Sequence, residues 1–266
     1  MSVCHERFYT RHFKHEWSSS DLIDCFHLRY KVFCLEEGFL TADDYPYRYE
    51  YDQYDALSEH IGIYESRSDT SDTLVGYVRL VKYSKDLGFP TAHHYSELYD
   101  KLSGLPLEKV YEISRLCISP MYRQRLVSID ELYGRKDYST DYPKKRKYPI
   151  VLALLLKAMY QTSINTGGRF WIASKEPGLI RYFSSLFGLK SVRLANDYID
   201  FYGKVMPCLT EIDQAFIRMS ETVPEIHEFF VEDQETATQK QWMSKAQWSL
   251  PLSRSKSDYP AISQHY

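Results

Sequence analysis

The sequence predicts one α/β domain with a mixed, mostly antiparallel sheet and helices on both faces. Short apolar runs typical of strands dominate its first half, and a helix–strand–helix–strand succession fills much of its second half. Strands joined by turns pair antiparallel, whereas a helical crossover joins parallel strands and covers a face of the sheet. The 266 residues suffice for one such core with an extension.

The first half supplies a strand, a helix and a hairpin. We expect a strand at 8–14 and a helix at 21–37, which Ser18, Ser19 and Ser20 can cap. Residues of one face of this helix are Leu22, Phe26, Arg29 and Phe33. Apolar runs at 59–64 and 74–81 flank a polar turn and indicate a β-hairpin. A short helix near 93–102 then precedes a strand at 111–119.

The second half begins with an irregular segment at 121–147, and connections of this length are often functional. The elements expected after it are a helix at 149–164, a strand at 169–174, a helix at 177–187, strands at 191–194 and 198–205, and a helix at 211–230. Pro177 favours a helix start, and Gly188 favours a helix end.

Composition excludes several classes of function. A net charge of −3 argues against a nucleic-acid or membrane-surface role. The five cysteines are scattered without metal-ligand spacing, which indicates free thiols in a reducing compartment and no zinc site. The apolar run at 150–156 is too short to span a bilayer, and the first residues lack an apolar signal segment. We expect a cytoplasmic protein without a bound metal, a nucleic-acid partner or stable membrane insertion.

Charged residues inside apolar segments are the main functional signal. Glu112 and Arg115 lie in the strand at 111–119, Arg79 lies in the second hairpin strand, and Arg29 lies in the apolar helix face. Buried charges are costly unless they are paired, and the acidic segment at 50–55 offers partners. The alternatives are an edge strand with both charges in water, an arginine that reaches the surface, and a solvated acidic loop.

These charged residues fall into four pieces in order, RYKVF at 29–33, DQYD at 52–55, Arg79 with Leu80, and EISR at 112–115. Together they resemble the acyl-homoserine-lactone autoinducer synthases. They are also similar to the N-acyl amino acid synthases, and both groups are branches of the GNAT acyltransferase fold. With RYKVFCLEEGF at 29–39 and EPGLIR at 176–181, the wider pattern looks closest to acyltransferases associated with PEP-CTERM/exosortase systems.

The resemblance implies a GNAT-like acyltransferase domain at 1–207, a helical extension at 208–232 and a polar tail at 233–266. It implies an acceptor site whose substrate-binding residues are Arg29, Phe33, Phe39, Asp52, Asp55, Arg79, Cys117 and Ile118. The implied catalytic residues are Glu112 and Arg115. Autoinducer synthases carry tryptophan where this chain has Phe39, which disfavours S-adenosylmethionine and favours an amino acid or a similar small amine as acceptor.

The donor is expected to be an acyl-phosphopantetheine thioester, a co-substrate and not a permanently bound cofactor. A GNAT turn that cradles coenzyme A pyrophosphate is glycine-rich, but no such glycines follow the strand at 111–119. Acyl carrier protein is therefore favoured over coenzyme A. Its acidic surface and phosphate could dock on Arg123, Arg125, Lys144 and Lys145. A solvated basic turn is the alternative for this segment.

Direct attack by the amine on the thioester is the expected mechanism, with Glu112 as general base and a backbone N–H near 117–119 as oxyanion donor. No Ser-His-Asp or Cys-His arrangement is evident, and Cys117 at a strand centre is more typical of a core residue than of a nucleophile. Positions 112 and 115 face opposite sides of a regular strand, so their sharing of a pocket predicts a β-bulge. The expected acyl tunnel is bounded by Leu152, Leu155, Met159, Phe170 and Trp171.

The alternatives to an N-acyltransferase that uses acyl carrier protein are a GNAT enzyme using acetyl- or acyl-coenzyme A on a small amine, an acyl-homoserine-lactone synthase, and a non-catalytic ligand-binding relative. In a non-catalytic relative, Glu112 would only pair with an arginine.

Overall fold

A computed structural model of the protein describes residues 8–14, 20–66, 72–128, 132, 147–201 and 203–231. Its main sheet has eight strands in the order β1-β2-β3-β4-β7-β10-β8, with β9 also paired to β10. The strands are β1 Phe8–Lys14, β2 Ser58–Glu65, β3 Thr73–Lys82, β4 Val110–Ile118, β7 Phe170–Lys175, β8 Val192–Arg193, β9 Ile199–Asp200 and β10 Lys204–Glu211. Strands β4 and β7 are parallel, and the other neighbours are antiparallel.

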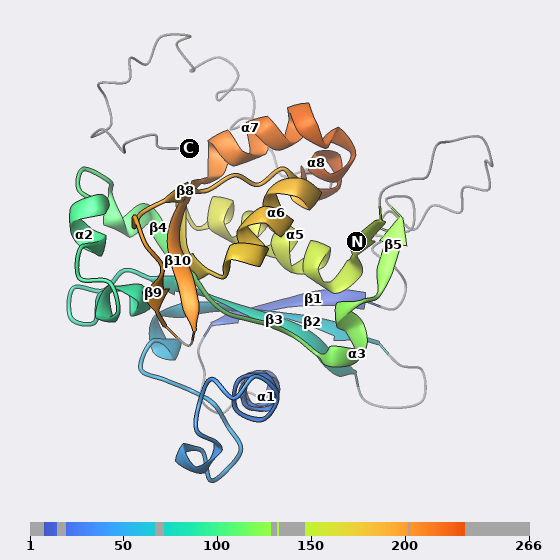
Figure 1. The fold of residues 1–266 in the computed structure, drawn as a ribbon. Coiled ribbons are helices and arrows are strands. Elements are labelled where there is room, and N and C mark those ends of the chain that lie inside the picture. Colours follow the sequence, from blue (N-terminus) through green and yellow to red (C-terminus); the bar gives the residue numbers. More distant parts are fainter. Residues whose placement is uncertain are drawn as a thin grey trace, which may run out of the picture.

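Helices cover both faces of this sheet. The helices are α1 Ser20–Arg29 with its continuation η1 Tyr30–Glu36, α2 Leu98–Lys101, α3 Pro120–Arg123, α5 Ile150–Asn165, α6 Pro177–Phe187, α7 Ile212–Thr222 and α8 Pro224–Val231. Helix α1 lies on one face, and α5 to α8 lie on the other (Figure 1). The expected mixed, mostly antiparallel sheet with helices on both faces is confirmed.

Short 3₁₀ turns join these elements in the first half of the chain, at Ala42–Asp44, Asp55–Leu57, Pro90–His93 and Leu107–Lys109. The expected helix near 93–102 is thus split into a 3₁₀ turn at Pro90–His93 and the single turn of α2. A small second sheet pairs β5 Leu126–Ser128 with β6 Lys147–Pro149, at the two ends of the long segment expected to be irregular. Residues 129–131 and 133–146 of that segment lie outside the described residues.

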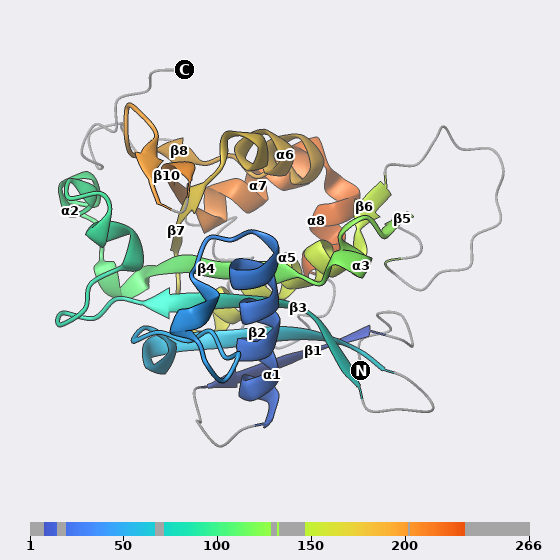
Figure 2. The ribbon, with the colours of Figure 1, turned by 60° about the horizontal axis from the view of Figure 1, so that its bottom comes forward.

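The helix predicted at 21–37 is present, but its second half has a different geometry. It begins as an α-helix and continues from Tyr30 to Glu36 as a π-helix. A π-helical turn is rare and places its side chains differently from an α-helical turn, and such turns often occur at functional sites. Figure 2 shows this helix in front of strands β1 to β4.

The end of the chain differs from the sequence expectation. The long strand beside β7 is β10, which runs to Glu211, whereas we expected a strand that ends at 205. The boundary expected after 207 therefore falls inside β10. Helices α7 and α8 also bury residues in the main core, which includes Ile212, Phe216, Met219, Ile226, Phe229 and Phe230. Residues 233–266 of the expected tail lie outside the described residues.

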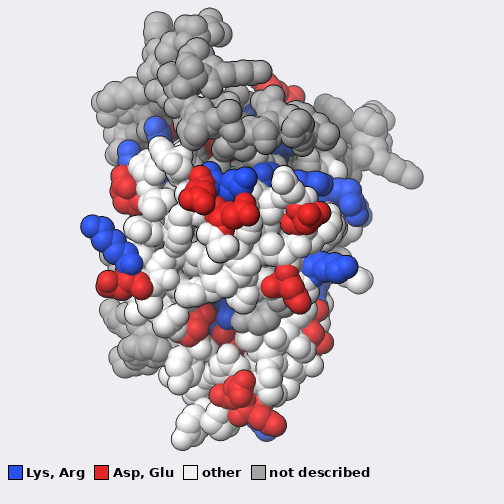
Figure 3. Space-filling model, turned by 60° about the vertical axis from the view of Figure 1, so that its left-hand side comes forward, with Lys and Arg blue, Asp and Glu red and all other residues white. Residues whose placement is uncertain are grey.

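The described surface mixes both signs of charge. On the face shown in Figure 3, acidic and basic side chains are interspersed around a largely uncharged centre. Among the described helices, none combines the length and apolar character that crossing a membrane requires.

The close packing of α5 on β3 depends on Gly76 at the centre of the sheet. A Cβ atom there would lie 2.4 Å from Val151 Cγ1 and 3.2 Å from Leu155 Cδ1. Because Val151 is β-branched and held within a helix, it has little rotamer freedom to move aside.

We expect Gly76→Ala to lower the free energy of unfolding by about 1–3 kcal/mol, the usual cost of overpacking a core. Chemical denaturation measures this change. The control is Gly178→Ala in α6, where a Cβ would meet no atom within 4 Å and where alanine favours the helix. Equal stability of the two variants would contradict the close approach of α5 to β3.

Candidate active site

A cavity opens where the pairing of β4 with β7 ends. The two parallel strands pair only from Val110 to Glu112 and from Phe170 to Ile172. Beyond this point, residues of both strands line a cavity of about 250 Å³. Phe33 of η1 lines it on the α1 face, and Leu156 and Met159 of α5 line it on the opposite face. The cavity therefore passes between β4 and β7 from one face of the sheet to the other.

Most of the wall on the α5 and α6 face is apolar. Its lining residues include Leu156, Met159, Trp171, Leu179, Phe183 and Leu189. Met159 and Trp171 lie where the sequence placed the acyl tunnel. Leu152, Leu155 and Phe170 do not line this cavity and pack instead in the hydrophobic core. Leu155 faces Gly76, and its neighbour Leu156 faces the cavity.

The predicted β-bulge in β4 is confirmed. Tyr77 pairs with Cys117 and Arg79 pairs with Ser114, so two residues of β4 stand opposite one residue of β3. Arg115 in the bulge has φ +55°, a left-handed conformation that is uncommon outside glycine. The bulge lets Arg115 line the same cavity as Glu112.

Three arginines and three acidic residues form a network between α1 and the sheet. Arg29 Nε lies 2.5 Å from Glu50 Oε2, and Arg29 Nη1 lies 2.6 Å from Asp55 Oδ1. Arg79 Nη1 binds Asp55 at 2.8 Å and Asp52 at 2.6 Å. Arg115 Nη2 reaches Glu50 at 3.1 Å and Asp52 at 3.3 Å. The network therefore balances three positive charges with three negative charges.

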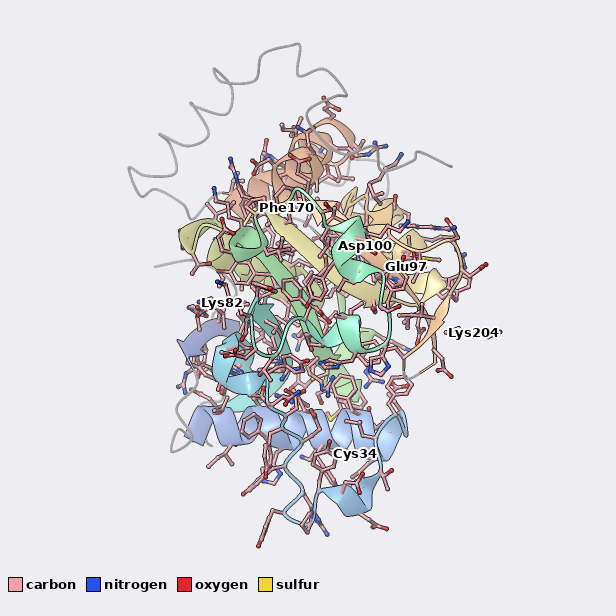
Figure 4. All side chains as sticks on the ribbon, turned by 90° about the vertical axis from the view of Figure 1, so that its left-hand side faces the viewer. Cys34, Lys82, Glu97, Asp100, Phe170 and Lys204 are labelled. Carbon is pink, nitrogen blue, oxygen red and sulfur yellow. The ribbon has the colours of Figure 1, made fainter. Side chains whose placement is uncertain are left out.

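This network is unusually well shielded from water. Arg29, Glu50, Asp55 and Arg79 are each 0% exposed. Burial alone would raise the carboxyl pKa values, but Arg29 and Arg115 lower the pKa of Glu50 to about 2, and Arg29 and Arg79 hold the pKa of Asp55 well below its usual value. Glu50 and Asp55 are thus expected to be ionised near neutral pH. Figure 4 shows nitrogen and oxygen atoms gathered between the helix that carries Cys34 and the strands above it.

Aromatic rings complete the acceptor side. The Phe33 ring centre lies 5.5 Å from Arg115 Cζ and 6.5 Å from the centre of the Phe39 ring. Both phenylalanines line the cavity. The six expected residues Arg29, Phe33, Asp52, Asp55, Arg79 and Arg115 thus come together around one end of it, with Phe39 beside them.

Glu112 lies next to this network but is not ion-paired within it. Its carboxyl accepts hydrogen bonds from Thr91 N–H at 3.1 and 3.2 Å and from Thr91 Oγ1 at 2.9 Å, and it is 2% exposed. Thr91 Oγ1 also contacts Ser174 Oγ at 2.9 Å. Burial raises the pKa of Glu112 to about 7, although Thr91, Arg79 and Arg115 act in the opposite direction. Glu112 can therefore exchange a proton near neutral pH.

Sequence reasoning did not single out Glu50, Thr91 or Ser174. Glu50 forms ion pairs with Arg29 and Arg115, and its position in the acidic segment 50–55 was the one sequence feature that could have identified it. Thr91 lies in a 3₁₀ turn far from β4 in sequence, and no pattern at Pro90–His93 points to Glu112. Only the three-dimensional contact identifies it.

The remaining expected residues lie away from the cavity lining. Cys117 is buried in a small apolar cluster, and burial raises its thiol pKa to about 12, which agrees with a core role. Ile118 packs against the main core. The N–H of Ser119, within the segment considered for the oxyanion donor, is bound to Val75 O at 2.9 Å. Lys144 and Lys145 lie outside the described residues.

The two arginines expected to bind the donor already have partners. Arg123 Nη2 lies 2.6 Å from Glu36 Oε2, and Arg123 Nε donates to Ile118 O at 2.9 Å. Arg125 lies 3.6 Å from Glu65, with its Cζ 5.1 Å from the centre of the Phe8 ring. Among the described residues, no group of three or more His, Cys, Asp or Glu side chains could hold a metal ion.

The family comparison agrees with this geometry. The model of the acetyltransferase (GNAT) domain matches residues 28–129. The matched stretch contains the whole charged network, Thr91 and Glu112. The expected resemblance to GNAT-fold synthases and the expected class of enzyme, an acyltransferase, are confirmed. No curated protein matches the chain in sequence.

Two solved structures share the fold at low identity, and a third matches with a lower score. The CoA-dependent acyl-homoserine lactone synthase BjaI with MTA has a TM-score of 0.55 and 15% identity, covering 82% of this chain and 90% of that chain. TofI in a ternary complex with an inhibitor and MTA has a TM-score of 0.52 and 15% identity, and the match covers 82% of this chain and 98% of TofI. FeeM, an N-acyl amino acid synthase from uncultured soil microbes, has a TM-score of 0.47 and 13% identity, covering 80% and 94%.

We expect Asp55→Asn to lower the free energy of unfolding by about 3–5 kcal/mol, because it leaves Arg29 and Arg79 buried with one negative charge too few. Urea denaturation near neutral pH measures the loss. The matched control is Glu36→Gln, which removes a half-exposed partner of Arg123 and should cost less than about 1 kcal/mol. A small effect of Asp55→Asn would show that the network tolerates an uncompensated charge.

Proposed function

We propose that the protein is an N-acyltransferase that moves a fatty acyl group from a phosphopantetheine thioester to the amine of an amino acid or a similar small molecule. The observation that carries this proposal is the position of Glu112. Its carboxyl, with a pKa of about 7, lines a cavity that joins a charged recess on the α1 face to an apolar recess on the α5 and α6 face.

The charged recess suits a polar acceptor. A primary amine is protonated near neutral pH and attacks a thioester only after it has lost a proton. Glu112 serves as the base, directly or through a water molecule. Arg115 is 11% exposed and lines the cavity, so it is placed to bind a carboxylate of the acceptor.

The apolar recess suits the acyl chain. With the chain against Met159, Trp171 and Phe183, the thioester carbonyl lies in the gap between β4 and β7, where Glu112 can serve the attacking amine. The new bond joins the amine nitrogen to the carbonyl carbon, the carbon–sulfur bond breaks, and the pantetheine thiol leaves with a proton. No acyl-enzyme is required, which agrees with the buried, protonated thiol of Cys117.

Acyl carrier protein is the proposed donor, because the sequence after β4 lacks a glycine-rich phosphate turn and carries the basic run at 144–147. Coenzyme A is the second candidate. It is favoured by the ion pairs of Arg123 with Glu36 and Glu37, which occupy one guanidinium that would otherwise dock a carrier protein. A cytoplasmic location and a link to PEP-CTERM/exosortase systems belong to the same proposal, since they follow from the cysteine content and the sequence resemblance.

Purified protein, incubated with acyl carrier protein or coenzyme A thioesters and a panel of amino acids, is expected to form N-acyl amino acids detectable by mass spectrometry. We expect Glu112→Gln to lower kcat/KM about 100-fold or more, the usual contribution of general base catalysis. The wild-type rate should rise with pH through about 7 as Glu112 loses its proton, and this inflection should vanish in the variant. Unchanged turnover would remove Glu112 from the base role.

Stability provides the control for Glu112→Gln. Because the folded-state pKa is raised, Glu112 contributes its full stability below its ordinary pKa of 4.5, and that contribution is lost as pH rises through about 7. A glutamine does not titrate. The stability of the variant relative to wild type should therefore improve between these two pH values, whatever happens to activity.

The choice of donor is tested by charge reversal. We expect the double variant Lys144→Glu and Lys145→Glu to raise KM for acyl carrier protein thioesters about tenfold and to leave KM for coenzyme A thioesters unchanged, because only the carrier protein presents an extended acidic surface. Lys101→Glu on α2 is the matched control. Equal effects on both donors, or none, would contradict docking of a carrier protein on this run.

A further inference from the structure

Two polar side chains, which a third one joins by hydrogen bonds, interrupt the apolar wall of the cavity. Lys175, at the end of β7, and Thr210, on β10, both line it. Ser191 joins them, since Lys175 Nζ donates to Ser191 Oγ at 2.8 Å and Ser191 Oγ lies 2.7 Å from Thr210 Oγ1. None of the three has a role in the mechanism proposed above.

The lysine is a cation without an acidic partner. Among the described residues, no carboxylate forms an ion pair with Lys175, although its neighbour Glu176 also lines the cavity. Its ammonium lies 5.8 Å from the centre of the Phe183 ring. Burial lowers the pKa of its amine, Cys208 acts in the opposite direction, and no carboxylate contributes. An ammonium with one neutral hydrogen-bond partner retains donor capacity for a ligand.

The position of Lys175 at the end of a strand does not force its ammonium into the cavity. A lysine at the end of a strand can extend its four-carbon stem and place the charge in water. Here the side chain is only partly exposed, and its ammonium donates to Ser191 in a cavity that Phe183 and Leu189 also line. Partly burying a cation against apolar side chains without an acidic partner is unfavourable for folding, which points to a role in binding.

The ammonium lies on the side of the sheet that holds the acyl chain. Side chains alternate along β7, so Trp171, Ala173 and Lys175 share one face. Trp171 Nε1 donates to Ser163 of α5 at 2.8 Å, which identifies that face as the α5 side. Ser174 points the other way and contacts Thr91, the partner of Glu112. Lys175 is thus separated by the sheet from the charged recess that suits the acceptor amine.

We propose that Lys175, supported by Ser191 and Thr210, binds an oxygen substituent on the acyl chain, so that the enzyme prefers hydroxy-, oxo- or carboxy-acyl donors to plain chains of the same length. This inference rests on the proposed function. A hydrogen-bond-accepting oxygen satisfies the lysine, whereas a plain methylene chain leaves the ammonium desolvated and without a new partner.

The test compares donors of equal chain length that carry no substituent, a hydroxyl, a ketone or a terminal carboxylate. We expect wild-type kcat/KM to favour at least one oxygenated donor about tenfold or more, the discrimination typical of a hydrogen bond to a charged group. Lys175→Met keeps a similar length without the charge and should abolish this preference while it retains turnover of the plain donor. The substituent that gains most identifies the oxygen group that Lys175 binds.

Controls separate this inference from the function itself. Lys157→Met on α5 removes a buried lysine that packs on Phe229 and does not line the cavity, and it should leave the donor preference unchanged. Thioether analogues of the donors, which cannot transfer an acyl group, report the same preference as a ratio of Kd values by calorimetry.

A wild-type enzyme that transfers plain chains as well as every oxygenated chain would overturn the role of Lys175 and leave the acyltransferase proposal intact. Absence of transfer from every donor, with discrimination retained among the thioether analogues, would overturn the catalytic proposal and support the binding role. If Lys175→Met fails to fold, the wild-type ratios and the variant Thr210→Val decide the question, because the variant should weaken the same preference.

Discussion

The site depends on a balance of charge between α1 and the sheet. Arg29, Arg79 and Arg115 are held in place by Glu50, Asp52 and Asp55, and four of these six side chains are fully buried. Each guanidinium shares a carboxylate with another, so no member can leave without exposing a partner to an apolar environment. This constraint fixes α1, the acidic segment and β4 relative to one another, and it places Phe33 and Arg115 beside the cavity.

The gap between β4 and β7 divides the chemistry into two environments. On one face, ionised groups and Glu112 surround the place proposed for the amine. On the other, α5 and α6 supply an apolar wall that excludes water from the proposed acyl chain. Burial raises the pKa of Glu112, and this shift persists against the opposing hydrogen bonds from Thr91 because no arginine of the network forms an ion pair with the carboxyl. A paired Glu112 would resemble Glu50, whose pKa is about 2, and would be a weak base.

Much of this arrangement follows from sequence patterns. The charged residues Arg29, Arg79 and Glu112 inside apolar segments pointed to one buried site. The alternation of side chains along a strand, with Glu112 and Arg115 three positions apart, predicted the bulge. Thr91 could not be found in this way, because its contact with Glu112 joins segments that share no periodicity. The sequence predicted Leu155 in the cavity wall, but its neighbour Leu156 lines the cavity. The pattern could not distinguish the two because nearly every position of α5 is apolar and buried, so the helix shows no distinct inner face.

The single inserted residue at Arg115 also affects how this site can change over evolutionary time. Because side chains alternate along a strand, removing one residue from the bulge would restore a regular ladder and move Arg115 away from Glu50 and Asp52. The deletion would also move every β4 side chain on one side of it to the opposite face of the sheet, relative to β3. Length changes in β4 are therefore far less tolerable than substitutions, and relatives that keep this charged recess should keep the extra residue as well.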